Sequence, residues 1–358
     1  MMYLIEPLFD TAYLGLIIGL GLRLLLENNR NAKQFGLMAI ILGLGDAFHL
    51  LPRIVSNLTV NGFDKYVSWL SWGEFVTSIT MTVFYILFYR YYRSLSGDKN
   101  RTKAGLIYAL AAIRVIMVLL PQNLWGTNGS YLFGLLRNIP FALMGLLLII
   151  WTWKHRNEDG LKNTSILIAA SFIFYLPVVA GARFIPALGA LMMPKTIAYV
   201  LLVVTGFRYF IKDFSPLNIL KDSAVFLFLG LAGGVFYREF TKLFAWDEFT
   251  VLSLVHAHLL ALGFIVLLAI YALMQSEEKK SVEISAPLKV YISGLAWTAA
   301  AFMVRGIYGI VSPGIKLFSD VALSGIAGLG HIILGIGIVW TTLMLIKIKS
   351  ENRSVKYE

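Results

Sequence analysis

Four of the five histidines in this chain lie in apolar stretches that are long enough to cross a membrane, and three of these four occur in the last third of the chain. His256 and His258 belong to the segment "TVLSLVHAHLLALGF", and His331 belongs to "SGIAGLGHIILGIG". Imidazole is a common ligand of zinc, copper and haem iron. An ionisable group in hydrocarbon is unfavourable and usually marks a functional site or a buried polar partner. These three residues are therefore candidate ligands within the membrane.

The spacing of the histidines limits which of them can act together. Residues two positions apart on a helix point about 200° apart, so His256 and His258 cannot both bind one ion from a regular helix. A rise of about 1.5 Å per residue from the outer helix ends places His258 about 14 Å deep and His331 about 16 Å deep. The sequence therefore predicts that His331 pairs with His256 or with His258, and leaves that choice open.

Small residues share the helix face of His331. Ser324, Gly328 and Gly335 follow the helical spacing of that face. A surface without side chains would admit a flat macrocycle, which favours haem b held by two histidines between helices. A transition metal ion is the second interpretation, with Glu239 as a further candidate ligand. Without a cofactor, small residues would only allow close helix packing, and the histidines would belong to a structural polar network.

A second group of ionisable residues is predicted in the outer halves of the N-terminal helices. Its members are Asp46, His49, Arg53, Glu74, Arg114 and Arg137, followed by Arg183 and Lys195. Asp46, His49 and Arg53 occur at i, i+3 and i+7, on one face of a helix. A carboxylate beside an imidazole could perform acid–base chemistry or only orient the ring. Buried ion pairs within a helix bundle are the first interpretation of these charges. The alternative is an outward-open, cationic pocket for a small anionic ligand, a lipid or a quinone.

Hydrolytic chemistry has little support in this sequence. The chain contains no cysteine, and it lacks the nucleophile elbow of serine hydrolases. Only His49 and His155 occur in the first 220 residues, too few for a zinc site of three histidines. Whether the protein is an enzyme stays open. The leading hypothesis is a redox or sensing protein with haem or a metal ion, and the alternative is a cofactor-free transporter or lipid-binding protein.

The elements that position these residues are predicted to be membrane-spanning helices. Of the 358 residues, 58% are hydrophobic and 14% are charged, whereas a soluble domain carries about 25% charged residues. Stretches near the roughly 20 residues needed to span a bilayer are predicted at 8–26, 35–52, 67–88, 104–120, 131–152, 164–182, 187–207, 222–241, 249–273, 290–311 and 321–346. The sequence therefore predicts an all-α polytopic bundle of eleven transmembrane helices.

The distribution of basic residues predicts the orientation of the chain. Most of the 31 Lys and Arg residues fall in alternate connections, such as "RYYRSLSGDKNRTK" and "MQSEEKKSVEISAPLK". Basic connections face the cytoplasm, which predicts a multi-pass protein of the bacterial plasma membrane with an outer N-terminus and a cytoplasmic C-terminus. The net charge of +11 then reflects the bilayer as partner, not nucleic acid. No basic signal-peptide region precedes the first span, so we expect that span to be retained.

A boundary between two helical modules is predicted in "FRYFIKDFSPLNILKD", which contains Pro216 and a cluster of charges. It separates a seven-helix module, 1–220, from a four-helix module, 221–358. The segments "GGVFYREFTK", "LVHAHLLALGF", "RGIYGIVS" and "SGIAGLGHIILGIG" resemble an uncharacterised bacterial family of four-helix integral-membrane proteins. The segment "GLGDAFHLLPRI" resembles a second uncharacterised bacterial module, with seven helices. These resemblances imply helical membrane folds and assign no activity.

Overall fold

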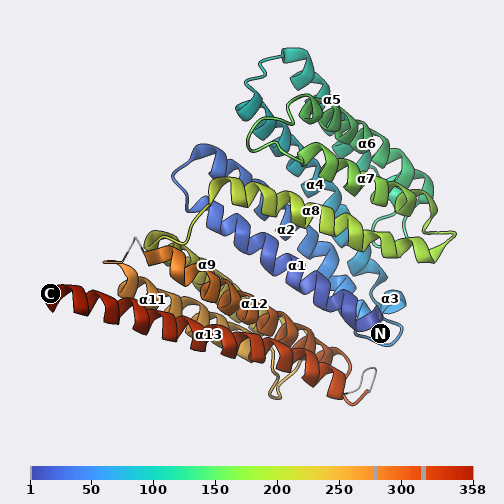
Figure 1. Ribbon diagram of the computed structural model, residues 1–358. Coiled ribbons are helices and arrows are strands. Elements are labelled where there is room, and N and C mark those ends of the chain that lie inside the picture. The colour runs from blue at the N-terminus through green and yellow to red at the C-terminus, as the bar shows by residue number, and fades with distance from the viewer. Residues whose placement is uncertain (1, 278–279, 316–319, 358) are drawn as a thin grey trace. The chain divides into compact units, whose positions relative to one another are not determined.

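The computed structural model describes residues 2–277, 280–315 and 320–357, and within them it contains helices and no strands (Figure 1). Eleven helical segments of the described residues are long and apolar enough to cross a membrane. Each corresponds to one of the predicted spans. The all-α, multi-pass fold predicted from hydropathy is therefore confirmed.

The helices of the first part of the chain are α1 Met2–Leu25, α2 Arg30–Asn57, α3 Gly62–Lys65, α4 Val67–Ser96, α5 Arg101–Leu119, α6 Tyr131–Lys154, α7 Thr164–Gly181 and α8 Met192–Phe210. The 3₁₀ turns η1 Pro121–Asn123 and η2 Pro186–Leu191 precede α6 and α8. The second part contains α9 Pro216–Leu243, α10 Ser253–His258, η3 Leu259–Ile265, α11 Val266–Met274, α12 Ser281–Val311 and α13 Asp320–Tyr357. Several helices are longer than their predicted spans, because hydropathy marks only the apolar centre of a helix that continues into polar residues.

Polar side chains and glycine define several helix ends. The side chain of Asn100 accepts hydrogen bonds from the amides of Thr102 and Lys103 at the start of α5, as an N-cap residue should. Gly97 ends α4 in the left-handed region, with a φ of 67° and its N–H bonded to the carbonyl of Arg93. Glycine adopts this conformation without a steric penalty. The connection between α4 and α5 is thereby fixed by local interactions.

The chain divides into two compact units. Unit 1 comprises Met1–Gly19, Ile54–Gly62 and Lys212–Glu358, and unit 2 comprises Leu20–Arg53 and Phe63–Ile211. Unit 2 lies entirely within the predicted module 1–220. Unit 1 contains all of 221–358 together with 212–220, most of α1, and the end of α2 with the connection that follows it.

In unit 2, glycines bring α2 and α4 into close contact. A Cβ atom added to Gly73 would collide with the main chain of Phe48 and His49. The hydroxyl of Thr77 donates a hydrogen bond of 2.9 Å to the carbonyl of Gly45. Small residues and side-chain hydrogen bonds are the usual means of helix association in membranes. This contact fixes the relative positions of His49 on α2 and Glu74 on α4.

In unit 1, α9, α11, α12 and α13 lie side by side (Figure 1). The closest approach is between α12 and α13, where a Cβ atom on Gly337 would lie 2.5 Å from the Cα of Tyr291. A Cβ atom on Gly294 would collide with the main chain of Leu334. The indole N–H of Trp297 also donates to the carbonyl of Ile326 at 2.9 Å. These contacts hold α13 against α12.

The helix that carries His256 and His258 is not regular. It begins as α10, widens into the π-helix η3 directly after His258, and continues as α11. Gly263 of η3 faces the ring of Phe226, and an added Cβ atom would lie 2.6 Å from that ring. The hydroxyl of Tyr291 donates to the carbonyl of Leu262 at 2.6 Å. Hydropathy does not reveal a π-helix, which often occurs at a functional site; the regular helix expected here is therefore corrected.

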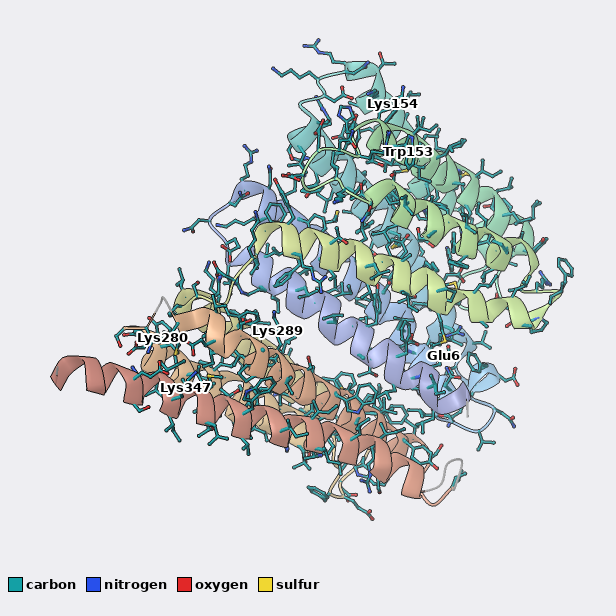
Figure 2. All side chains as sticks on the ribbon, in the orientation of Figure 1. Glu6, Trp153, Lys154, Lys280, Lys289 and Lys347 are labelled. Carbon is teal, nitrogen blue, oxygen red and sulfur yellow. The ribbon has the colours of Figure 1, made fainter. Side chains whose placement is uncertain are left out.

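Basic residues gather at the end of unit 1 where the chain ends. Lys280 pairs with Glu351 at 2.9 Å, and Lys349 pairs with Glu277 at 3.1 Å. Figure 2 shows Lys280 and Lys347 near this end. Ion pairs thus join the residues at the start of α12 and the end of α13, and the location of this end in the cytoplasm stays a prediction.

Candidate functional site

The structure brings His258 of α10 together with His331 of α13. The centroids of the two imidazole rings are 6.1 Å apart, and the ring planes are nearly perpendicular, at 88°. Phe302 of α12 packs against both rings, with centroid distances of 5.0 Å and 5.4 Å. The side chain of His258 is half-buried, and that of His331 is exposed at the surface of the unit. Of the two histidines that the sequence left as partners for His331, the structure places His258 beside it.

Each of the two rings is oriented by a contact of its Nδ1 atom with the main-chain carbonyl four residues earlier. The Nδ1 atom of His258 lies 2.9 Å from the carbonyl oxygen of Leu254, and that of His331 lies 2.9 Å from the carbonyl oxygen of Ala327. A carbonyl oxygen only accepts hydrogen bonds, so Nδ1 is the donor in each ring. In the neutral imidazole, Nε2 then carries the free lone pair. A histidine bound to a metal is commonly held in this way, with one nitrogen on the protein and the other on the metal.

His256 faces a different helix. Its ring stacks on Tyr237 of α9, with a centroid distance of 6.2 Å and an interplanar angle of 15°. A Cβ atom on Gly234 would lie 3.7 Å from the Cγ atom of His256. Within the described residues, its buried Nδ1 atom has no hydrogen-bond partner. His256 and His258 therefore point to different neighbours, as their spacing of two residues requires.

The glycines beside His331 leave the helix surface open. A Cβ atom added to Gly328 or Gly335 would meet no heavy atom within 4 Å. The close contact with α12 involves other glycines of the same helix, Gly330 and Gly337. Close packing within this chain thus accounts for Gly330 and Gly337 but not for Gly328 and Gly335.

Glu239, the predicted carboxylate ligand, forms an ion pair with its neighbour on α9. Its Oε1 atom lies 2.6 Å from Nη2 of Arg238, and both side chains are exposed. Throughout the described part of the chain, no three His, Cys, Asp or Glu side chains come together as a possible metal site. The structure therefore offers a pair of histidines as ligands and does not gather the larger set of His256, His258, His331 and Glu239.

In unit 2, an ion pair joins α4 to α6. Nη2 of Arg137 lies 2.5 Å from Oε1 of Glu74, and Nη1 of Arg137 donates to Oδ1 of Asn123 at 2.9 Å. The side chain of Arg137 is 6% exposed, whereas that of Glu74 is 54% exposed. The guanidinium of Arg137 also lies 4.4 Å from the ring centroid of Trp125. This buried cation is fully engaged by its neighbours.

Asp46 and His49 lie on α2, and the main chain of His49 is part of the contact with Gly73 of α4. Asp46 is buried and interacts electrostatically with Lys195 and Tyr199 of α8. His49 interacts with Arg53 and Lys195, and its Nδ1 atom has no partner among the described residues. That Asp46, His49 and Glu74 share one outward-open cavity stays a prediction, with Asp46 buried and Glu74 exposed.

Arg114 lies in a cluster of tyrosines that the sequence analysis missed. Its side chain is 2% exposed, and its Cζ atom lies 3.5 Å from the ring centroid of Phe141. Tyr85, Tyr175 and Tyr199 are its electrostatic neighbours. The hydroxyl oxygens of Tyr85 and Tyr199 are 3.0 Å apart. These tyrosines come from three separate helices, and apolar periodicity does not distinguish a tyrosine of a polar cluster from one of an apolar core.

Comparison with known proteins bears on unit 1. Residues 217–348 match the family described as protein of unknown function DUF2871. The matched region contains His256, His258 and His331, and it extends from α9 into α13. The C-terminal part of the chain is thus similar to an uncharacterised family, in agreement with the resemblance seen in its motifs. No match was found among curated proteins or solved structures.

Proposed function

We propose that the C-terminal four-helix part binds a transition metal, either as the iron of haem b or as a single ion, through Nε2 of His258 and Nε2 of His331. The observation that carries this proposal is the paired orientation of the two rings. They belong to separate helices, their centroids are 6.1 Å apart, and both Nδ1 atoms are hydrogen-bonded to the main chain. The two nitrogens left as ligands thus belong to neighbouring rings.

The separation of the rings suits one shared metal. Bonds from imidazole nitrogen to a metal are about 2.0–2.1 Å long, so two nitrogens on one metal lie no more than about 4 Å apart. The 6.1 Å separation of the ring centroids is compatible with two nitrogens on one metal. Two imidazoles favour iron, copper or zinc over magnesium or calcium, which prefer oxygen ligands.

The surroundings of His331 favour haem. Bis-histidine haem requires a flat, apolar space beside its ligands. His331 is exposed, Gly328 and Gly335 leave its helix face open, and Phe302 supplies an apolar wall against both imidazoles. When bound, haem iron supplies one-electron redox chemistry. The role proposed for the protein is accordingly redox transfer or sensing in the membrane.

The alternative is a cofactor-free transporter or lipid-binding protein with structural histidines. The hydrogen bonds of Nδ1 to Leu254 and Ala327 support this alternative as well, because they satisfy one polar atom of each ring. The two functions differ in what the purified protein contains. A cofactor-free protein is colourless and metal-free.

The test compares the wild type with three single variants purified in the same detergent, with haem measured by absorbance and metals by mass spectrometry. We expect His258→Ala and His331→Ala to lower the cofactor content at least about tenfold. His256→Ala is the matched control, since its ring faces Tyr237, and it should retain the cofactor. Equal content in all four proteins, including a content of zero, would show that the histidines are structural.

A further inference from the structure

We propose that unit 2 contains a binding site for a carboxylate or phosphate group, centred on the guanidinium of Arg114. This site is independent of the histidine pair in unit 1. The first observation is that, within the described part of the chain, the guanidinium of Arg114 lacks hydrogen-bond partners for two of its nitrogens. Nε and Nη1 of Arg114 are buried and have no hydrogen-bond partner among the described residues, although the side chain is only 2% exposed.

A buried guanidinium without a counter-ion is unfavourable, because arginine stays charged and cannot release its proton in a protein. The neighbouring buried arginine has a carboxylate partner, since Arg137 pairs with Glu74. The electrostatic neighbours of Arg114 are instead Tyr85, Tyr175, Tyr199 and Arg137. None of these groups supplies a negative charge at neutral pH, so a bound anion would complete the site.

The groups around Arg114 can donate hydrogen bonds to an anion. Tyr85 and Tyr199 share one hydrogen bond of 3.0 Å between their hydroxyls. Whichever of them accepts that bond keeps its own O–H, for which Ser171 is a hydrogen-bond partner in this structure and a bound anion would be a competing acceptor. The ammonium of Lys195 lies 5.3 Å from the ring centroid of Tyr175 and 5.4 Å from that of Tyr199. A second cation thus borders the same tyrosines, and its own electrostatic partner is the carboxylate of Asp46.

The chemistry of these donors indicates the class of ligand. A guanidinium binds planar carboxylates and phosphates through two parallel hydrogen bonds, donated by Nε with Nη2 or by Nη1 with Nη2. The two atoms of Arg114 without a partner among the described residues, Nε and Nη1, each belong to one of these edges. The Phe141 ring lies against the guanidinium at 3.5 Å, so it leaves the guanidinium edge as the binding surface. Arg114 is five residues from the end of α5, which corresponds to about 8 Å along the helix axis. The anionic group of a lipid and that of a small soluble molecule could both reach this depth.

The test measures anion-dependent stability of the full-length protein in phosphatidylcholine nanodiscs. The soluble probes are sodium phosphate and sodium acetate, compared with sodium chloride at equal ionic strength, and the lipid probe is added phosphatidylglycerol. A ligand that binds only the folded state raises the melting temperature. We expect at least one probe to do so. A response to phosphatidylglycerol alone identifies a lipid headgroup, and a response to phosphate or acetate identifies a free anion.

Three variants separate binding from structure. Arg114→Met removes an unpaired buried charge, so it should be as stable as the wild type without anions and should lose the anion response. Arg114→Lys keeps the charge without the paired donors and should bind the probe about tenfold more weakly. Arg156→Met removes an exposed arginine and should respond as the wild type does. The proposal is overturned if Arg114→Met keeps the response, if no probe stabilises the wild type, or if both Arg114 variants fail to fold.

Discussion

A matched pair of glycine substitutions distinguishes the two faces of α13. Gly337 lies against α12, and a Cβ atom there would be 2.5 Å from both the N and the Cα atom of Tyr291. Main-chain atoms cannot move aside as the end of a flexible side chain can, so the helices must separate or tilt. Overpacking of this kind costs about 1–3 kcal/mol. Gly335, two residues earlier, would meet no heavy atom within 4 Å.

We therefore expect Gly337→Ala to be less stable than Gly335→Ala. Both substitutions gain the same helix propensity, about 0.5–1 kcal/mol. Their difference of about 1–3 kcal/mol then reports the contact with Tyr291 alone. Thermal unfolding in detergent, followed by the helical circular dichroism signal, should show a melting temperature several degrees lower for Gly337→Ala. Equal stability of the two variants, or the reverse order, would refute the packing of α12 on α13.

The open face of α13 also provides a test of the cofactor. Gly335→Leu adds a large side chain next to His331, at a position where an added Cβ atom meets no heavy atom within 4 Å, so we expect the protein to fold. If haem lies on this face, its content should fall. A single metal ion between the imidazoles needs less space and should be retained. Haem absorbance and metal analysis of one purified variant thus separate the two forms of the proposed site.

Three further predictions concern orientation and electrostatics. A reporter fused to the C-terminus should be active only as a cytoplasmic fusion, and activity in an exported compartment would contradict the predicted topology. Glu74→Gln should lower the free energy of unfolding by about 1–3 kcal/mol, because it leaves Arg137 buried without its anion; in the double variant with Arg137→Met the two losses should not add. Burial works to raise the pKa of Asp98, but hydrogen bonds from Lys103 and the Asn100 amide hold it below its usual value. The ionised carboxylate of Asp98 therefore stabilises the folded state at neutral pH, and this stabilisation is lost as the pH falls through the lowered pKa. Asp98→Asn should have a lower melting temperature than the wild type at pH 7 and the same melting temperature in strong acid.

The sequence determined the spans, because each helix satisfies its own backbone hydrogen bonds and its apolar length must match the bilayer. These are properties of contiguous segments. The same local geometry separated His256 from His258, since residues two apart on a helix cannot share a face. The structure bears this out, with His256 on Tyr237 and His258 beside His331. The ion pair of Glu74 with Arg137 joins two residues of the predicted polar group, although their contact was not predicted.

Only the tertiary structure decided which residues meet, because the rotation of each helix about its axis results from many small contacts with its neighbours. The pairing of His258 with His331 depends on where Gly294 and Gly337 let α12 and α13 approach. The same helix crossing leaves the face of Gly335 without a neighbour among the described residues. The sequence alone does not distinguish this row of small residues from the row that contacts α12. The π-helix after His258 arises where Gly263 meets Phe226, which is a contact with a different helix. The tyrosines around Arg114 likewise come from separate helices, and no local pattern brings them together.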